Sequence, residues 1–306
     1  MRHWSDIAID DLLAARGEQR VSVVIPARDE EASVGTVVAA LRRDWVEGVP
    51  LVDEVVVIDS DSMDTTAAVA GAAGAVVFSA REIRPDLGPG RGKGEALWKA
   101  LHVVSGDILV FIDADLLEWG THFVPGLLGP LLTETGVQLV KAVYDRPLLD
   151  AQGHEAESGG RVTELVARPL LALHWPQLSA IVQPLAGEWA VRRSVFETLS
   201  VPMGYGVEIA ALVDVATRFG VEAVSQVDLG RRAHRHHRHD TLGPMAVQVL
   251  AAAEARIGAR VPARAPSVVE LVQFDRAPTG FLPRLRHPDI GERPPAVSVA
   301  GFRGRR

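Results

Sequence analysis

The sequence predicts an α/β fold in which a Rossmann-like, mostly parallel sheet is flanked by helices. Short runs of β-branched and apolar residues recur along the first half of the chain, and stretches of helical length separate them. The runs are apolar throughout instead of alternating with polar residues, which is typical of strands covered by helices on both faces. These observations support the fold most strongly over residues 21–145.

The predicted elements alternate in order along that half. The strands are VSVVIPA (21–27), EVVVIDS (54–60), AVVFSA (75–80) and DILVFIDAD (107–115). Helices are expected at 30–44, 64–73 and 92–104, the first with its apolar residues on one helical face. The second half is less regular, with helices expected near 161–174, 206–219 and 242–257 and a strand near 222–230.

Composition and charge exclude several classes of protein. The chain has 306 residues, 47% of them apolar, and no cysteine, so disulfides and thiolate zinc sites are excluded. No apolar run is long enough to span a bilayer, and residues 1–20 lack the apolar stretch of a signal peptide, so we expect a cytoplasmic protein. The net charge of −7 argues against a general nucleic-acid binder, whereas the cationic segment RRAHRHHRHD (231–240) suits a small anionic ligand.

Acidic and small polar residues follow three of the predicted strands, at 26–30, 59–62 and 113–115. Ligands of open parallel sheets bind beyond the carboxyl ends of the strands, so three such endings together predict a site. Asp113 and Asp115 supply the hard oxygen ligands that a divalent cation prefers, and such a cation would offset the charge of a nucleotide diphosphate. The alternative is a strand that simply ends in water.

The Gly-rich loop GPGRGKG (88–94) is not a nucleotide-binding P-loop. Lys93 is followed by Gly94 instead of Ser or Thr, and the loop does not follow the first strand. Lys93 and Arg91 are nevertheless suited to contact a donor phosphate or a base edge. The alternative for both is a solvated turn.

The order of the strand endings, PxxxE, then DSxSxD, then DxD, resembles that of GT-A glycosyltransferases, which use nucleotide-sugars. Longer strings resemble the glucosyl-3-phosphoglycerate synthases of actinobacteria. They are RGKGEALWKAL, VKAVYDRPL, GGRVTELVARPLL, QPLAGEWAVRR, GYGVEIAALVD and QVDLGRRAHRH, and the likeness covers about residues 20–240. The resemblance implies a retaining enzyme that moves glucose from a nucleotide-sugar, UDP-glucose in the first place, to the 2-hydroxyl of 3-phosphoglycerate.

The resemblance also implies roles for individual residues. The donor-binding positions are Pro26, Ala27, Arg28, Glu30, Ser60, Lys93, Asp113 and Ala114. The metal, Mg²⁺ or Mn²⁺, would be held by Asp113, Asp115 and His234. The catalytic positions are Asp115, Glu208 and Lys93, and the acceptor-binding positions are Gly160, Arg161, Thr163, Arg232 and His236.

The residue types agree with part of this assignment. Gly160, Arg161 and Thr163 form a glycine-to-helix start, where backbone amides, a guanidinium and a hydroxyl can bind a phosphate or a carboxylate. A purely structural cation at Arg161 is the weaker interpretation because the helix dipole opposes it. Glu208 begins an apolar helix, where it could also serve only to balance the dipole.

The chain departs from the family at a few positions. His236 stands where relatives carry Asn on the acceptor side, DSDS stands where relatives often read DSGS, and QPLAGEW lacks a second Gly and a Tyr. His236, His237 and His239 could form a metal cluster, but a cationic loop is the favoured interpretation.

Three activities remain as alternatives. The same chemistry with GDP-mannose would give mannosyl-3-phosphoglycerate, and the sequence leaves the donor base, the sugar and the identity of the metal open. A polyprenyl-phosphate glycosyltransferase begins with a similar first strand but usually needs membrane contact. The last alternative is a nucleotide-sugar-binding regulator without catalysis.

We expect three parts along the chain. Residues 1–150 form the nucleotide-sugar-binding part, 151–262 the acceptor-binding part and 263–306 an extended tail. The tail carries large apolar residues among Pro and Arg, so it should lie along another surface, of its own domain or of a second subunit. We therefore expect a homodimer, the alternative being a disordered tail on a monomer.

Overall fold

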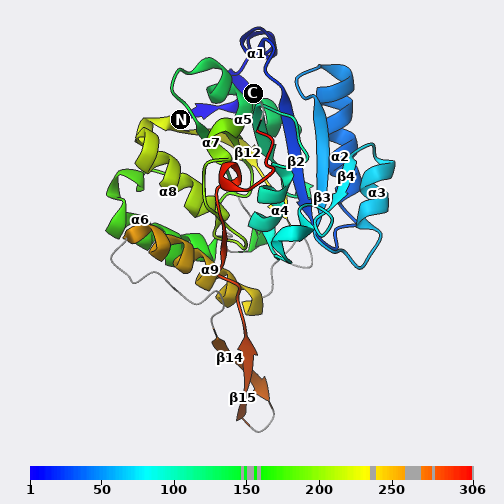
Figure 1. Ribbon diagram of the computed structural model, residues 1–306. Coiled ribbons are helices and arrows are strands. Elements are labelled where there is room, and N and C mark those ends of the chain that lie inside the picture. The colour runs from blue at the N-terminus through cyan, green and yellow to red at the C-terminus, as the bar shows by residue number, and fades with distance from the viewer. Residues whose placement is uncertain are drawn as a thin grey trace.

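The computed structural model describes residues 1–145, 148–149, 155–156, 160–234, 239–258, 270–277 and 280–304. Its centre is an eight-stranded sheet in the order β1-β12-β7-β10-β5-β2-β3-β4, with helices on both sides (Figure 1). Every strand of this sheet runs parallel to its neighbours except β10, which is antiparallel to both β5 and β7. The predicted α/β class with a mostly parallel sheet is therefore confirmed.

The elements of the described residues have the following bounds. The sheet strands are β1 (Arg2–His3), β2 (Val21–Ala27), β3 (Glu54–Asp59), β4 (Val76–Ser79), β5 (Ile108–Phe111), β7 (Leu139–Asp145), β10 (Trp189–Arg192) and β12 (Val224–Arg231). The other strands are β6 (Leu116–Glu118), β8 (Leu148–Leu149), β9 (Glu155–Ala156), β11 (Val201–Pro202), β13 (Ala233–His234), β14 (Leu271–Ala277), β15 (Gly280–Arg286) and β16 (Glu292–Arg293). The α-helices are α1 (Ile9–Arg16), α2 (Val34–Arg42), α3 (Thr66–Ala72), α4 (Lys93–Ala100), α5 (Phe123–Thr133), α6 (Arg168–His174), α7 (Arg193–Phe196), α8 (Val207–Phe219) and α9 (His239–Ile257), and a π-helical turn η4 (Thr163–Ala167) precedes α6.

Every helix and strand predicted for the first half is present, within a few residues of its expected bounds. The difference that matters for the site concerns the strand predicted at 107–115, because β5 ends at Phe111. Asp113 and Asp115 therefore lie in the turn after the strand and not within it. Within the described part of the chain, no helix combines the length and the apolar character needed to cross a membrane.

Both faces of the central strands are buried, which explains their largely apolar sequence. Along β2, Val23 and Ile25 belong to one hydrophobic cluster and Val24 to a second. β5 divides in the same way, with Val110 in the first cluster and Phe111 in the second. Since neighbouring side chains of a strand point to opposite faces, the two clusters lie on the two sides of the sheet.

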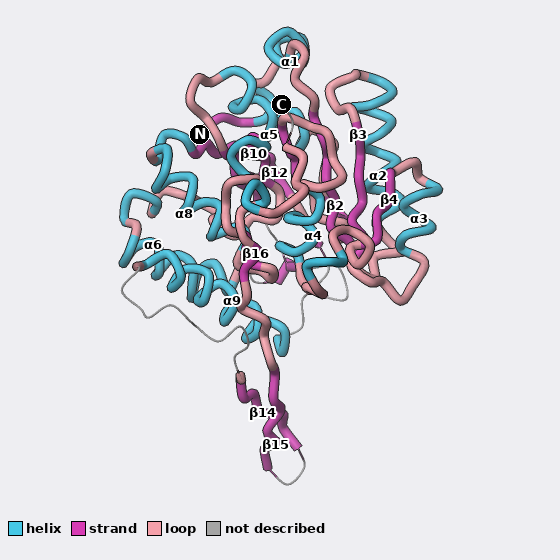
Figure 2. Tube along the Cα trace, in the orientation of Figure 1, coloured by secondary structure: helices cyan, strands magenta, loops and turns pink. Residues whose placement is uncertain are grey.

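The stretch 287–304 packs back onto the body of the chain. β16 pairs with β11, and the indole Nε1 of Trp98 in α4 donates to the carbonyl of Pro294 at 2.9 Å. Ala296 is fully buried in the cluster that contains α4. For this stretch, the surface that covers the predicted tail is thus the chain's own body, formed by α4 and by residues 197–203. By contrast, β14 and β15 pair with each other and project from the body as a hairpin (Figures 1 and 2).

The packing of this C-terminal stretch around His102 predicts that the folded state loses stability in acid. Its ring lies 4.7 Å from that of Trp98 and 5.2 Å from that of Phe302, and its Nε2 is buried with no hydrogen-bond partner among the described residues. Burial, together with the nearby Arg84, lowers the pKa of His102 from 6.5 to about 4. The folded state therefore holds a neutral ring that the unfolded state would protonate.

We expect this contribution to stability to be complete above pH 6.5 and to be lost as the pH falls through 4. His102→Leu should reduce the loss of unfolding free energy between pH 7 and pH 4 by on the order of 2 kcal/mol. Urea unfolding of both proteins at the two pH values measures the difference, with the exposed His174→Leu as a control. An equal pH dependence in His102→Leu and the parent protein would contradict it.

Candidate active site

Hydrogen bonds tie the carboxyl ends of β2 and β3 together. The amide of Ser60 donates to the carbonyl of Ala27 at 2.9 Å, and the amide of Asp29 donates to Ser62 Oγ at 2.9 Å. In return, Asp29 Oδ1 accepts a hydrogen bond from the amide of Met63 at 2.7 Å. Predicted donor-side positions from two separate strands therefore lie on one fixed edge of the sheet.

The remaining donor-side positions of β2 lie on the same edge. Pro26 is near the end of the strand, Arg28 is exposed just after it, and the amide of Glu30 donates to Thr66 Oγ1 at 2.7 Å. Next to them, Asp59 is buried and its Oδ1 has no hydrogen-bond partner among the described residues. This end of the sheet thus presents polar groups that are held in place by their neighbours.

Lys93 joins two carboxylates that come from distant parts of the chain. It is the first residue of α4, and its ammonium lies 2.6 Å from Asp113 Oδ1 and 3.0 Å from Glu208 Oε1 in the first turn of α8. Burial alone would lower the pKa of Lys93, but the two carboxylates outweigh it and raise the pKa, so the side chain stays charged. Three residues from separate sequence motifs therefore meet in one cluster.

The glycines before and within the start of α4 allow a close approach of another backbone segment. A Cβ on Gly94 would overlap the carbonyl oxygen of Pro202, and Gly92 has a φ of +121°, which favours glycine. The amides of Gly94 and Glu95 donate to the carbonyls of 204 and 203 at 3.3 and 2.9 Å. These amides are already used, so a phosphate contact from this loop would come from side chains such as Lys93. This agrees with the exclusion of a P-loop.

Arg232 is buried in the middle of the acidic cluster. Its Nη2 lies 2.9 Å from Asp113 Oδ2, 2.9 Å from Glu188 Oε1 and 3.8 Å from Asp115 Oδ1, and its guanidinium lies 5.3 Å from the centre of the Tyr144 ring. Burial would lower the pKa of Arg232, but Glu188 and the other anionic groups raise it overall. The structure therefore places this predicted acceptor residue directly against the predicted metal ligands.

Glu188 and Gly187 are parts of this cluster that sequence reasoning missed. Glu188 is fully buried, burial raises its pKa, and its Oε2 accepts a hydrogen bond from the Tyr144 hydroxyl at 2.7 Å. A Cβ on Gly187 would clash with Asp113 and lie 2.8 Å from Lys93 Nζ. The signal in the sequence is a charged residue directly before the apolar run Trp189–Val191 of β10, where a surface position would not be expected.

The structure locates only some of the predicted metal ligands. The backbone of His234 pairs in β13 with Leu116 of β6, which is the neighbour of Asp115 in sequence, so the third predicted ligand lies beside the acidic pair. Among the residues that the structure describes, no group of three or more His, Cys, Asp or Glu side chains is gathered as a metal site. The His234 side chain and all of His236 lie outside the described part. The donor set of Asp113, Asp115 and His234 fits a hard divalent cation by its chemistry.

The predicted acceptor segment lies at the start of another helical stretch. Gly160 has a φ of +100°, helical structure begins at Arg161, and Thr163 is buried at the start of η4. Val162 packs into the hydrophobic cluster beneath α8, the helix that carries Glu208. The segment is therefore anchored to the same helix as one member of the charged cluster.

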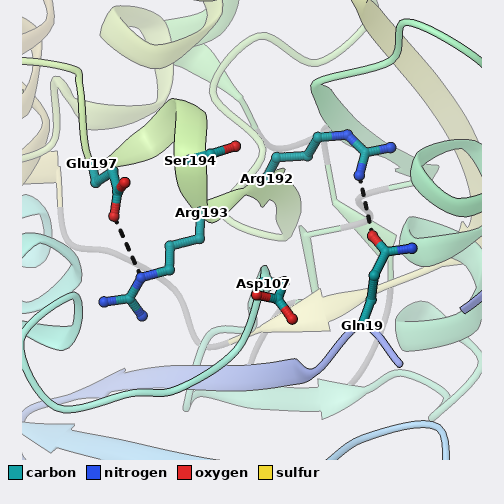
Figure 3. Close-up of a pocket in the computed structure, with 6 residues that line it drawn as sticks. All are labelled: Gln19, Asp107, Arg192, Arg193, Ser194 and Glu197. Atoms are coloured by element: carbon teal, nitrogen blue, oxygen red, sulfur yellow. Dashed lines mark hydrogen bonds and ion pairs between the residues drawn. The ribbon is translucent and has the colours of Figure 1, made fainter. Parts of the chain in front are cut away.

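A cavity lies at the opposite edge of the sheet, where β2 and β5 begin (Figure 3). Its lining residues are Gln19, Asp107, Arg192, Arg193, Ser194 and Glu197. Arg193 donates to the carbonyls of Leu101 and Val104 at 2.6 and 2.8 Å, and Arg192 likewise donates to backbone carbonyls. Because these guanidiniums bond the backbone, the cavity has a structural explanation and is not the predicted site.

Comparison with known proteins agrees with the geometry. Residues 22–167 match the model of Glycosyl transferase family 2. Glucosyl-3-phosphoglycerate synthase from Mycolicibacterium smegmatis is 45% identical over 291 residues, which cover 95% of this chain and 93% of that protein. The protein of the same name from Mycobacterium tuberculosis is 48% identical over 275 residues, covering 89% and 82%.

Solved structures give the same result. The crystal structure of the Mycobacterium tuberculosis enzyme with Mn²⁺, uridine diphosphate and phosphoglyceric acid has a TM-score of 0.83 at 43% identity and covers 95% of both chains. A second structure of that enzyme, with Mn²⁺ and UDP-glucose, has a TM-score of 0.82 at 43% identity and covers 95% of this chain and 94% of that chain.

The chain is a GT-A glycosyltransferase. Its sheet is mostly parallel, a carboxylate pair and cations meet at the ends of the strands, and the sequence matches a glycosyltransferase family. The fold class implied by the sequence motifs is thus confirmed. Within this class, the chain belongs to the glucosyl-3-phosphoglycerate synthase family.

Proposed function

We propose that this chain transfers glucose from UDP-glucose to the 2-hydroxyl of 3-phosphoglycerate, with retention at the anomeric carbon. The observation that carries the proposal is the cluster of Lys93, Asp113 and Glu208, which come from three separate motifs and meet where the parallel strands end. The names and bound ligands of the relatives support the choice of substrates.

The donor would lie along the edge formed by β2, β3 and β5. Its binding positions are Pro26, Ala27, Arg28, Glu30, Ser60, Lys93, Asp113 and Ala114. Mg²⁺ or Mn²⁺, held by Asp113, Asp115 and His234, would offset the negative charge that develops on the leaving diphosphate. The ammonium of Lys93, which its carboxylate partners keep charged, adds a fixed positive charge at the same place.

The acceptor would be held by Gly160, Arg161, Thr163, Arg232 and His236. Its 2-hydroxyl attacks from the face that the diphosphate leaves, and its proton passes to the departing phosphate oxygen. Glu208 would lie near this hydroxyl or the sugar, and its contact with Lys93 fixes its orientation. Fixed charges and the positioning of the two substrates supply most of the rate.

Incubation with 3-phosphoglycerate and, in turn, UDP-glucose, GDP-glucose and GDP-mannose tests the proposal. Mass spectrometry should detect glucosyl-3-phosphoglycerate, formed fastest from UDP-glucose. Turnover with GDP-mannose alone would make the chain a mannosyl-3-phosphoglycerate synthase. Binding of a nucleotide-sugar without transfer would favour a regulator, and transfer to a polyprenyl phosphate would favour the membrane-associated alternative.

Arg161→Ala should raise the apparent KM for 3-phosphoglycerate by about 10-fold to 100-fold, as expected for loss of a charged hydrogen bond. UDP binding should stay nearly unchanged, because Arg161 belongs to the helical start assigned to the acceptor. Initial rates at varied 3-phosphoglycerate and calorimetry with UDP and Mn²⁺ measure the two effects. Lost UDP binding with an unaltered KM for the acceptor would contradict this division of the site.

We also propose which part of the chain binds which substrate. Residues 1–150 would bind the donor, 151–262 the acceptor, and 263–306 would form a C-terminal extension. The central sheet crosses the first boundary, because β10 and β12 lie in it beside strands of the first part. The proposed substrates are intracellular metabolites, so we also propose a cytoplasmic location, which fractionation of the source cells would test.

We propose a homodimer in which the β14–β15 hairpin supplies part of the contact, because this hairpin projects from the body (Figure 1). Light scattering at micromolar concentration should give twice the chain mass. Replacing 272–285 by a Gly-Ser turn should give a monomer, since Leu271 and Arg286 are paired and can be joined without strain. A monomeric mass for the parent chain would rule out the dimer, and a dimer without the hairpin would place the contact elsewhere.

A further inference from the structure

We propose that Arg293 is a positioning residue for the Gly-rich loop that leads into Lys93, so that the C-terminal stretch fixes the donor side of the site. The inference rests on the proposed function only in taking Lys93 as a donor contact. It assigns a role in the reaction to a residue that is far from Lys93 in sequence.

Arg293 binds both sides of the position from which Lys93 projects. Before Lys93, its Nη1 donates to the carbonyl of Leu87 at 2.8 Å and its Nη2 to the carbonyl of Gly88 at 3.0 Å. After Lys93, its Nε and Nη2 each lie 2.8 Å from a carboxylate oxygen of Glu95. The guanidinium thus joins the beginning of the loop to the first turn of α4.

Arg293 is itself held firmly. β16, which contains it, pairs with β11, and the next residue, Pro294, accepts the hydrogen bond of the Trp98 indole at 2.9 Å. The guanidinium also lies 5.5 Å from the centre of the Trp98 ring, and the side chain is only 12% exposed. Arg293 therefore acts as a fixed support and not as a mobile surface cation.

Glu95 needs this partner because it is buried. Its side chain is 2% exposed, and its other close cation is Lys99, 3.3 Å away. The loop packs directly on the ion pair, since a Cβ on Gly90 would lie 2.5 Å from Glu95 Cδ and 2.8 Å from Arg293 Nη2. A shift of the ion pair would therefore displace the loop.

The expected benefit is preorganisation of Lys93. A loop that is already ordered does not have to be ordered when the donor binds, so less binding free energy is spent on lost chain entropy. Loss of the Arg293 contacts should weaken donor binding first and leave acceptor binding largely as it is. If Arg293 had a merely structural role, its substitution would lower stability without weakening donor binding more than acceptor binding.

Arg293→Lys tests the proposal, and Arg192→Lys is a control. Arg192 is also a partly buried arginine that donates to two backbone carbonyls, those of Val137 at 3.1 Å and Leu131 at 2.5 Å, and it bonds Gln19 at 3.3 Å. These partners lie at the opposite edge of the sheet from the loop before α4. Both variants keep a positive charge and lose the planar fork of the guanidinium.

With Mn²⁺ present, calorimetry should show the dissociation constant of UDP raised about tenfold by Arg293→Lys and unchanged by Arg192→Lys. Without any ligand, hydrogen exchange of the amides of 88–93 should be about tenfold faster in Arg293→Lys alone. Equal UDP affinity and exchange in the two variants would overturn the proposal, and so would equal losses in both. If the parent chain did not bind UDP, the proposed function would fail, while hydrogen exchange would still test the positioning.

Gly90→Ala provides a second test that leaves Arg293 intact. The added methyl group should push the loop off the ion pair and raise the dissociation constant of UDP several-fold, on the order of fivefold, with the KM for 3-phosphoglycerate unaltered. Unchanged UDP affinity would show that the position of the loop does not matter for the donor.

Discussion

Asp115→Asn is expected to lower turnover by on the order of 10³-fold. The substitution keeps the shape of the side chain but removes the negative charge that the proposed divalent cation requires. Steady-state rates with UDP-glucose and 3-phosphoglycerate measure the loss. Calorimetry should show weaker Mn²⁺ binding as well, because the charge acts on the ion itself.

Asp10→Asn, at an exposed position of α1, is the control for loss of one carboxylate and should retain full activity. Excess EDTA should abolish turnover of the parent chain, and Mg²⁺ or Mn²⁺ should restore it. Full activity in excess EDTA would contradict the proposed metal site.

Gly187→Ala is expected to lower turnover by about 10²-fold, because a displacement of catalytic groups by about 1 Å costs that much. A Cβ at this position would clash with the Asp113 carboxylate and lie 2.8 Å from Lys93 Nζ, so the two side chains would have to separate. Stability should fall by only about 1–3 kcal/mol. Initial rates and urea unfolding of the variant measure the two quantities.

Gly71→Ala, in α3, is the matched control because its Cβ would meet only a methyl group at 3.9 Å. It should keep full activity and unfold at slightly higher urea concentration, as alanine favours helix. Near-normal turnover of Gly187→Ala would mean that Asp113 and Lys93 can separate without harm, which would weaken the role assigned to their contact.

Two neighbouring aspartates at the end of an apolar strand need compensation, and the structure supplies it. Each oxygen of Asp113 lies within 3 Å of a cationic nitrogen, Lys93 Nζ at 2.6 Å and Arg232 Nη2 at 2.9 Å. Asp115 lies 3.8 Å from the same guanidinium. Buried charges are tolerated only when paired, so these cations are needed for the acidic pair to exist here.

The fold of the first half was predictable because its signals are local. β2, β3 and β5 are almost entirely apolar, with Ser22 and the terminal Glu54 and Asp59 as the exceptions, because both of their faces are buried. The sequence motifs also predicted that Lys93, Asp113 and Glu208 belong to one site. Their mutual contacts, at 2.6 and 3.0 Å, were beyond sequence reasoning because they depend on how α4 and α8 meet.

The missed features depend on distant pairings. β10 is only four residues long, and nothing in WAVR indicates that it runs antiparallel between β5 and β7. Glu188 could not be recognised as a site residue until β10 was placed, because its partners Tyr144 and Arg232 lie far away in sequence. In the same way, the strongly cationic sequence around Arg232 suggested an exposed loop, whereas this arginine is 1% exposed.

The ion pair between Glu95 and Arg293 joins positions 198 residues apart, which affects how a growing chain can fold. Translation at 5–20 residues per second leaves roughly 10–40 seconds between the synthesis of the two residues. During that interval Trp98 lacks its carbonyl acceptor, and the pocket for Ala296 stays open. A nascent chain therefore exposes an apolar surface along α4 until residues 293–296 have left the ribosome. Chains truncated before Arg293 should be bound by chaperones, whereas the full chain should be released in folded form.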